Sequence, residues 1–146
     1  RQRGLRTHLV SVEPSETNVN FVMKNVFRIN NISMADRHIF LGFFGYKPTS
    51  KHWKHLPLFH LADVLADVQH VNLADFDAEG AEASIIMSAD DAVALETKVH
   101  RLLIETHKHF LNDMLAKLLH DHGFEVLENI PYSSKVSTDV GTIYWR

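Results

Sequence analysis

The spacing of apolar residues at the start of the chain predicts a strand followed by a helix. Residues 5–12 include several β-branched side chains and stop before Glu13-Pro14, which is typical of a short strand. Ser15 is a residue type that caps helices, and the apolar residues after it are spaced three, four and three apart, as on one helix face. These residues are Val19, Val22, Val26 and Ile29.

The middle of the chain contains one ambiguous apolar run and one amphipathic segment. Residues 39–46 are apolar on all sides, so their pattern does not choose between a buried helix and a buried strand. Residues 47–57 are basic and are expected to form a loop. Residues 58–70 predict an amphipathic helix, because their apolar residues form one stripe. The stripe consists of Leu61, Val64, Leu65 and Val68.

A strong capping signal starts a long helix in the second half of the chain. It consists of a capping serine and two acids of the first turn, Ser88, Asp90 and Asp91. The helix is expected to extend over residues 89–122 and to stop at Gly123. Its apolar stripe shifts along its length, so the helix either breaks near Thr106–His109 or contacts two neighbours.

These elements together predict an α+β fold. The length and the absence of a long linker favour one helix-rich globular domain over residues 1–146, in which residues 1–4 form an arm without fixed structure. Besides the long helix near 89–122, we expect a small sheet of three to four strands. Its strands are expected near residues 5–12, 83–87, 124–127 and 140–145.

Composition narrows the class of protein. The chain has no cysteine, which excludes disulfides, thiolate metal sites and a cysteine nucleophile and fits a reducing intracellular compartment. No stretch approaches eighteen consecutive apolar residues, so a soluble chain is expected. The first six residues are basic and carry no acid, which leaves two explanations open. They are either a trimmed end or the end of a leader for an organellar matrix.

Charge is segregated along the chain, although the formal net charge is only −3. Residues 1–60 hold nine Lys or Arg against three acids, a balance of +6, whereas residues 61–123 hold four against twelve, a balance of −8. Such halves can pair with each other on folding or can face two different partners.

Histidine is abundant, with eleven copies, and one group has metal-ligand spacing. On a helix over residues 58–70, imidazoles and carboxylates spaced three, four and three apart share one face, where they could bind a divalent ion. This candidate metal group is His60, Asp63, Asp67 and His70. The alternative is a solvated polar face. A second group, Glu96, His100 and His107, shares one side of the long helix but matches no metal-binding motif.

No motif for nucleophilic catalysis or phosphate binding is present. The sequence lacks a Gly-x-Ser-x-Gly elbow, a P-loop and a Gly-x-Gly-x-x-Gly fingerprint. The run Gly42-Phe43-Phe44-Gly45 is too apolar for a phosphate cradle and is expected in a core or turn. We therefore predict no catalytic residues and no cofactor.

Basic and aromatic residues supply a candidate partner surface. Cationic side chains neutralise phosphates and aromatic rings stack on bases, but both also concentrate binding energy at protein interfaces. The candidate partner-binding residues are Arg3, Arg6, Lys51, Trp53, Lys54, Tyr144 and Trp145. Other protein subunits are the expected partners, and nucleic acid is the alternative.

These observations favour a non-catalytic structural or interaction subunit of a larger protein complex over an enzyme. Two other functions stay open. One is a metal-dependent hydrolase that uses the His/Asp group of residues 60–70, in which a bound ion would activate water. The other is a nucleic-acid-binding module that uses the basic N-terminal third, whose binding would weaken steeply with salt.

Overall fold

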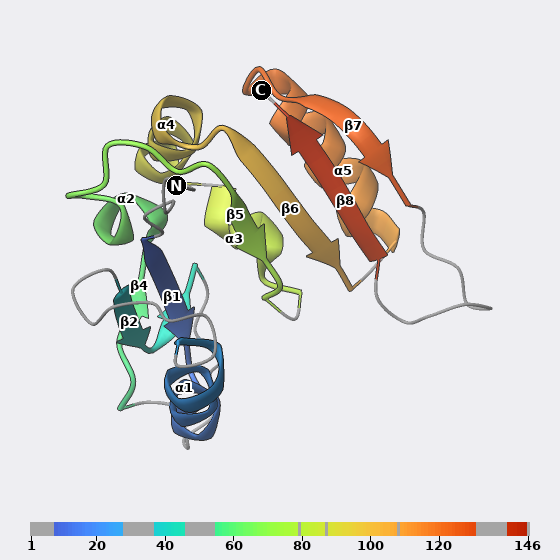
Figure 1. Cartoon of the computed structure of the whole chain (residues 1–146). Coiled ribbons are helices and arrows are strands. Elements are labelled where there is room, and N and C mark those ends of the chain that lie inside the picture. Colours follow the sequence, from blue (N-terminus) through green and yellow to red (C-terminus); the bar gives the residue numbers. More distant parts are fainter. Residues whose placement is uncertain are drawn as a thin grey trace, which may run out of the picture. The chain divides into compact units, whose positions relative to one another are not determined.

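A computed structural model of the chain describes residues 8–27, 37–45, 55–78, 80–86, 88–107, 109–130 and 140–145 (Figure 1). The chain forms two compact units, Arg1–Phe59 (unit 1) and His60–Arg146 (unit 2). The expectation of one domain over residues 1–146 therefore stays a prediction, and the expected arm over residues 1–4 lies outside the described residues.

Unit 1 begins with a strand–helix–strand segment. Strand β1 (Leu9–Glu13) is followed by helix α1 (Glu16–Phe21), its π-helical continuation η1 (Val22–Phe27) and strand β2 (Arg37–Leu41), which runs parallel to β1. The Ser15 side chain accepts a hydrogen bond from the Asn18 amide, so the predicted helix cap is confirmed.

The ambiguous apolar run of residues 39–46 forms strands where it is described. Strand β3 (Phe43–Phe44) pairs in parallel with β4 (Leu58–Phe59). Gly42 is buried before β3, and a side chain there would lie 2.6 Å from the carbonyl oxygen of Pro57. Only glycine lets the two segments approach so closely, which explains why this residue stands between β2 and β3.

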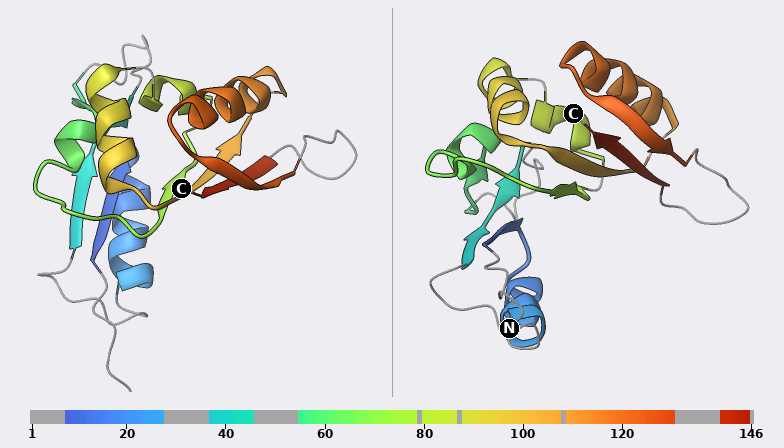
Figure 2. Two further views of the ribbon diagram at one scale, coloured as in Figure 1. Left: turned by 90° about the horizontal axis from the view of Figure 1, so that it is seen from above. Right: turned by 45° about the horizontal axis from the view of Figure 1, so that its top comes forward.

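Unit 2 combines a mixed sheet with four helices among its described residues. Its elements are α2 (Leu61–Val64), β5 (Ala74–Phe76), α3 (Glu82–Ile86), α4 (Ala89–Lys98), β6 (Arg101–Thr106), α5 (His109–Asp121), β7 (Glu125–Asn129) and β8 (Val140–Trp145). The sheet has the order β5-β6-β8-β7; β5 and β6 are parallel, and β8 is antiparallel to both of its neighbours. Helices α3 and α5 pack on the same face of this sheet (Figure 2).

The prediction of one long helix over residues 89–122 is wrong. Its start at Ser88 is confirmed, because the serine side chain accepts a hydrogen bond from the Asp91 amide. The helix ends at Lys98, however, and strand β6 follows. Along β6 every second side chain is buried, and these buried residues are Leu102, Ile104 and Thr106. Successive side chains of a strand point to opposite faces, so β6, which pairs with β5 and β8, has a two-residue period of burial. The prediction of a helix overlooked this period.

Two further predicted elements are also wrong. Residues 83–87, expected as a strand, lie mostly in helix α3, whose side chains are almost all buried, so no amphipathic period could reveal it. Residues 58–70, expected as one helix, hold only the two-residue strand β4 and the single helical turn of α2.

The coarse fold prediction is correct, since the chain is α+β with small parallel sheets and several helices. Strands are present near 124–127 and 140–145, as β7 and β8. The predicted single small sheet is not confirmed. The strand expected at 5–12 is observed as β1, which pairs in parallel with β2.

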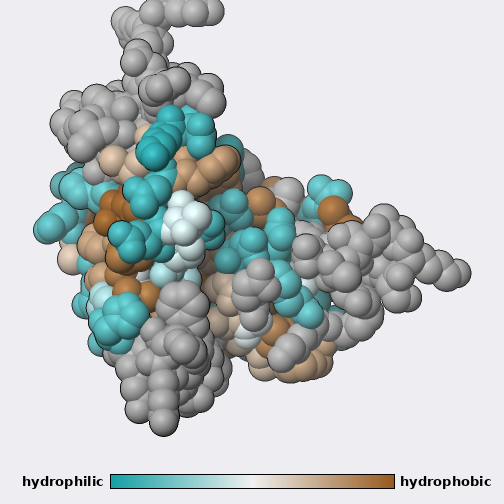
Figure 3. All heavy atoms as spheres, turned by 90° about the horizontal axis from the view of Figure 1, so that it is seen from below, coloured by the Kyte–Doolittle hydropathy of each residue, from teal (hydrophilic) through white to brown (hydrophobic). Residues whose placement is uncertain are grey.

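No helix within the described ranges is long and apolar enough to cross a membrane. On the face drawn in Figure 3, hydrophilic and hydrophobic residues of the described part are intermixed. The expectation of a reducing compartment stays a prediction.

Candidate functional site

Unit 2 gathers two carboxylates and one imidazole where its parallel strands end. Asp77 directly follows β5, Glu82 opens α3 after a short loop, and His107 directly follows β6. Because β5 and β6 are parallel neighbours, their carboxyl ends lie at the same edge of the sheet. Ligands of open α/β sheets bind outside such edges. These three residues are the Asp77–Glu82–His107 cluster.

Glu82 holds the loop between β5 and α3. Its side chain is completely buried, and its Oε1 atom accepts hydrogen bonds from the backbone amides of Ala78 at 3.1 Å and Gly80 at 2.9 Å. Gly80 has a φ of 97°, a conformation that favours glycine. The carboxylate therefore fixes the path of the loop from the inside.

His107 lies between the two carboxylates of the cluster. Its Nδ1 atom is 3.2 Å from Glu82 Oε1, and its Nε2 atom is 3.4 Å from Asp77 Oδ1. The His107 side chain is 17% exposed and that of Asp77 is 54% exposed, whereas Glu82 has no exposed surface. The imidazole thus has one edge toward a buried carboxylate and the other toward a carboxylate that water reaches.

Two buried polar atoms in this region lack hydrogen-bond partners within the described part of the chain. They are Glu82 Oε2 and Thr106 Oγ1, the latter at the last residue of β6. A buried polar group without a partner is costly, and native proteins retain few of them unless a ligand, an ion or water is bound nearby. Because Thr106 ends β6 and Glu82 contacts His107 directly after it, the two atoms mark this edge as a functional candidate.

Asp75 adds a further carboxylate close to the cluster. Partial burial raises the pKa of Asp75 above its ordinary value, and repulsion from Asp77 raises it further. The two residues are spaced two apart along an extended segment, so they share one face. Mutual repulsion of this kind makes the site favourable for a cation.

Unit 1 also has an acid at the carboxyl end of a parallel strand. Glu13 ends the parallel strand β1, and its Oε1 atom accepts a hydrogen bond of 2.7 Å from the Ser15 amide. This hydrogen bond fixes the Glu13 carboxylate at the end of β1.

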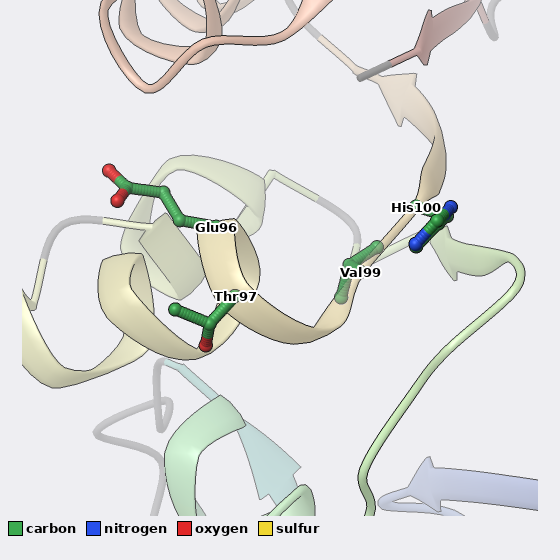
Figure 4. A pocket seen from close by; sticks show the side chains of 4 residues that line it. All are labelled: Glu96, Thr97, Val99 and His100. Atoms are coloured by element: carbon green, nitrogen blue, oxygen red, sulfur yellow. The ribbon is translucent and has the colours of Figure 1, made fainter.

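A pocket of about 260 Å³ lies elsewhere, where α4 passes into β6. Its lining residues are Glu96, Thr97, Val99 and His100 (Figure 4). This is the amino end of β6, so the pocket lies at the opposite end of the strand from the Asp77–Glu82–His107 cluster. Of the expected helical group, Glu96 pairs with His122 and the His100 ring contacts that of His70, whereas His107 belongs to the cluster.

The four predicted metal residues do not form one site. His60 is the N-cap of α2 and pairs with Asp91, Asp63 lies in α2, and Asp67 follows it in a turn. His70 lies beside Asn72 and His100. Their predicted helix does not form, so the shared face is lost. Within the described ranges, no three His, Asp or Glu residues are arranged to hold a metal ion.

The predicted partner surface falls largely outside the described residues. This applies to Arg3, Arg6, Lys51, Trp53 and Lys54. Tyr144 and Trp145 lie in β8, but their side chains are outside the described part of the structure. Protein or nucleic-acid partners therefore stay a prediction.

The sequence interpretation missed the cluster for an identifiable reason. The expected long helix over residues 89–122 places His107 on a helix face, not at the end of a strand. The available signal was the alternation of apolar and acidic residues over residues 73–77, followed by Gly80 and Glu82. That order is typical of a strand, a tight loop and a helix.

Solved structures with a similar fold include two enzymes. A Streptococcus pneumoniae protein assigned as a tRNA methyltransferase, in complex with S-adenosyl-L-methionine, matches with a TM-score of 0.54 and 14% identity over 95% of this chain and 66% of that chain. Precorrin 8w decarboxylase from Methanobacterium thermoautotrophicum matches with a TM-score of 0.55 and 12% identity over 96% of this chain and 82% of that chain. No protein-family model and no curated protein sequence matches this chain.

This similarity establishes a Rossmann-like fold of the kind found in methyltransferases. It also contradicts the prediction of a non-catalytic structural or interaction subunit, since the neighbours with this fold are enzymes. That prediction rests on the absence of catalytic motifs in the sequence. In such folds, however, reacting groups come from separate strand ends that no contiguous motif records. The chain spans about two thirds of the streptococcal protein.

Proposed function

We propose that this chain binds S-adenosylmethionine and belongs to a methyltransferase. The observation that carries the proposal is the Asp77–Glu82–His107 cluster at the carboxyl ends of β5 and β6. The fold likeness supports it, because the streptococcal neighbour is a complex with this compound. The proposal places the ligand at the same edge of the sheet, where α/β folds bind their substrates.

The charge of the cluster suits this ligand. S-adenosylmethionine carries a sulfonium cation, whereas S-adenosylhomocysteine has a neutral sulfur. Asp75 and Asp77 lie close enough that Asp77 raises the pKa of Asp75, so a nearby cation would relieve their repulsion. A cation about 4 Å from a carboxylate gains roughly 1–4 kcal/mol, depending on the local dielectric constant. When bound, S-adenosylmethionine would supply the methyl group.

Binding of the two compounds tests the proposal. We expect the full chain to bind S-adenosylmethionine in isothermal titration calorimetry. Asp77→Asn should weaken that binding about tenfold but weaken S-adenosylhomocysteine by less than about threefold, since the substitution removes charge and little volume. Asp77 is 54% exposed, so the variant is expected to fold normally.

Asp90→Asn is the matched control, because Asp90 is an exposed acid of unit 2 in the first turn of α4. It should leave both affinities unchanged. A wild-type chain that binds neither compound would contradict the proposed function. Equal weakening of both compounds by Asp77→Asn would instead contradict the role of the cluster's charge.

A further inference from the structure

We propose that His107 is a positioning residue, which sets the preference of this site for a cationic ligand by holding the Asp77 carboxylate in place. The inference rests on the proposed function and extends it to the residue that orients the charged group. It starts from the two contacts of the imidazole. The Nδ1 atom lies 3.2 Å from Glu82 Oε1, and the Nε2 atom lies 3.4 Å from Asp77 Oδ1.

Glu82 is the fixed end of this bridge. Its side chain has no exposed surface, and its Oε1 atom also accepts hydrogen bonds from the amides of Ala78 and Gly80. These bonds hold the carboxylate in one position, because a buried carboxylate cannot replace a lost protein partner with water. The imidazole that contacts this carboxylate is therefore tied to the loop between β5 and α3.

Asp77 is the end of the bridge that needs a partner. The amide of the next residue, Ala78, is bound to Glu82, but the Asp77 side chain itself is 54% exposed. Such a side chain has several staggered rotamers available. Repulsion between Asp75 and Asp77 favours the rotamers that separate the two carboxylates. The contact with His107 opposes this repulsion and keeps the Asp77 carboxylate near the end of β6.

The orientation of Asp77 affects the two candidate ligands differently. The attraction between a carboxylate and a sulfonium cation falls with distance, so an Asp77 that turns away attracts S-adenosylmethionine less strongly. S-adenosylhomocysteine has a neutral sulfur and loses little. The ratio of the two dissociation constants therefore reports on the position of Asp77, whereas a general loosening of the site would weaken both compounds.

Two conservative variants of the full chain separate this role from general support of the loop. The amide nitrogen of Asn lies close to the position of a histidine Nδ1, and that of Gln lies close to the position of Nε2. His107→Asn therefore keeps a donor toward Glu82, and His107→Gln keeps one toward Asp77.

In isothermal titration calorimetry, we expect His107→Asn to reduce the preference for S-adenosylmethionine over S-adenosylhomocysteine at least about threefold. His107→Gln should keep this preference within about twofold of wild type. If His107 acts through Asp77, His107→Asn should change the preference no further in a chain that already carries Asp77→Asn.

A measurement without ligand tests the bridge itself. Three-bond NMR couplings to the β protons of Asp77 should show one rotamer in the wild type and in His107→Gln, and averaging between rotamers in His107→Asn. His100→Asn is the matched control, because His100 lies at the other end of β6 and is exposed. It should leave the couplings and the ligand preference unchanged.

Rotamer averaging of Asp77 in the wild-type chain would overturn the assignment. Equal ligand preferences in His107→Asn and His107→Gln would also overturn it, as would an undiminished effect of His107→Asn in the Asp77→Asn chain. A wild-type chain that binds neither compound would instead count against the proposed function. The couplings would still show in that case whether His107 holds Asp77.

Discussion

Glu82→Ala should destabilise the protein by about 4 kcal/mol, the largest effect expected of any single substitution in the cluster. Glu82 is completely buried, so its removal leaves the amides of Ala78 and Gly80 without their acceptor. It also leaves His107 without its buried partner. Unpaired buried groups cost more than the net value of the bonds they lose. The free energy of unfolding in urea measures the effect.

Glu96→Ala is the control for this substitution, because Glu96 also pairs with a histidine, His122, but is 35% exposed. Exposed pairs contribute little, so we expect a loss below about 1 kcal/mol. A Glu82→Ala variant no less stable than Glu96→Ala would show that the loop does not depend on the buried carboxylate.

Asp91→Ala should destabilise the protein by about 3 kcal/mol, the second largest effect. Asp91 lies in the first turn of α4 but stabilises the start of α2. Its Oδ1 atom accepts a 2.9 Å hydrogen bond from the Ala62 amide, and its Oδ2 atom lies 3.3 Å from His60 Nδ1. The side chain of the N-cap residue of α2, His60, makes no capping hydrogen bond to the backbone of that helix. Asp91 therefore caps α2 from another helix.

Asp90, the neighbouring acid, distinguishes the capping role of Asp91 from the general preference of a helix N-terminus for negative charge. Asp90 lies in the same first turn but is exposed. Asp90→Ala should cost only about 0.5 kcal/mol, the value of a charge at a helix N-terminus. Equal losses for Asp90→Ala and Asp91→Ala in urea unfolding would contradict the capping role.

The sequence revealed the local signals and missed those that depend on packing. Ser15 and Ser88 were correctly identified as caps, because a capping residue acts on its own helix within three residues. Asp91 was identified only as a first-turn acid. Its contacts with Ala62 and His60 join residues about thirty positions apart, so the spacing of residues in the sequence does not reveal them.

The candidate site was hidden by the misassigned helix over residues 89–122. The apolar residues of Val99 to Thr106 are compatible with the period of a helix and with that of a strand. Only pairing with β5 and β8 makes this segment a strand. Once β6 is a strand, His107 comes to lie at its carboxyl end, beside the loop after β5. The four residues of the predicted metal group do not share a helix face for the converse reason, since the helix expected over residues 58–70 does not continue beyond Val64.

Backbone amide chemical-shift mapping with S-adenosylmethionine tests the central claim most directly. Ligand binding at the carboxyl ends of β5 and β6 should shift the amides of Asp77, Ala78, Gly80 and His107. The amides that line the pocket at the opposite end of β6, including Thr97 and His100, should remain unaffected. Shifts confined to that pocket, or no shifts at all, would contradict the account.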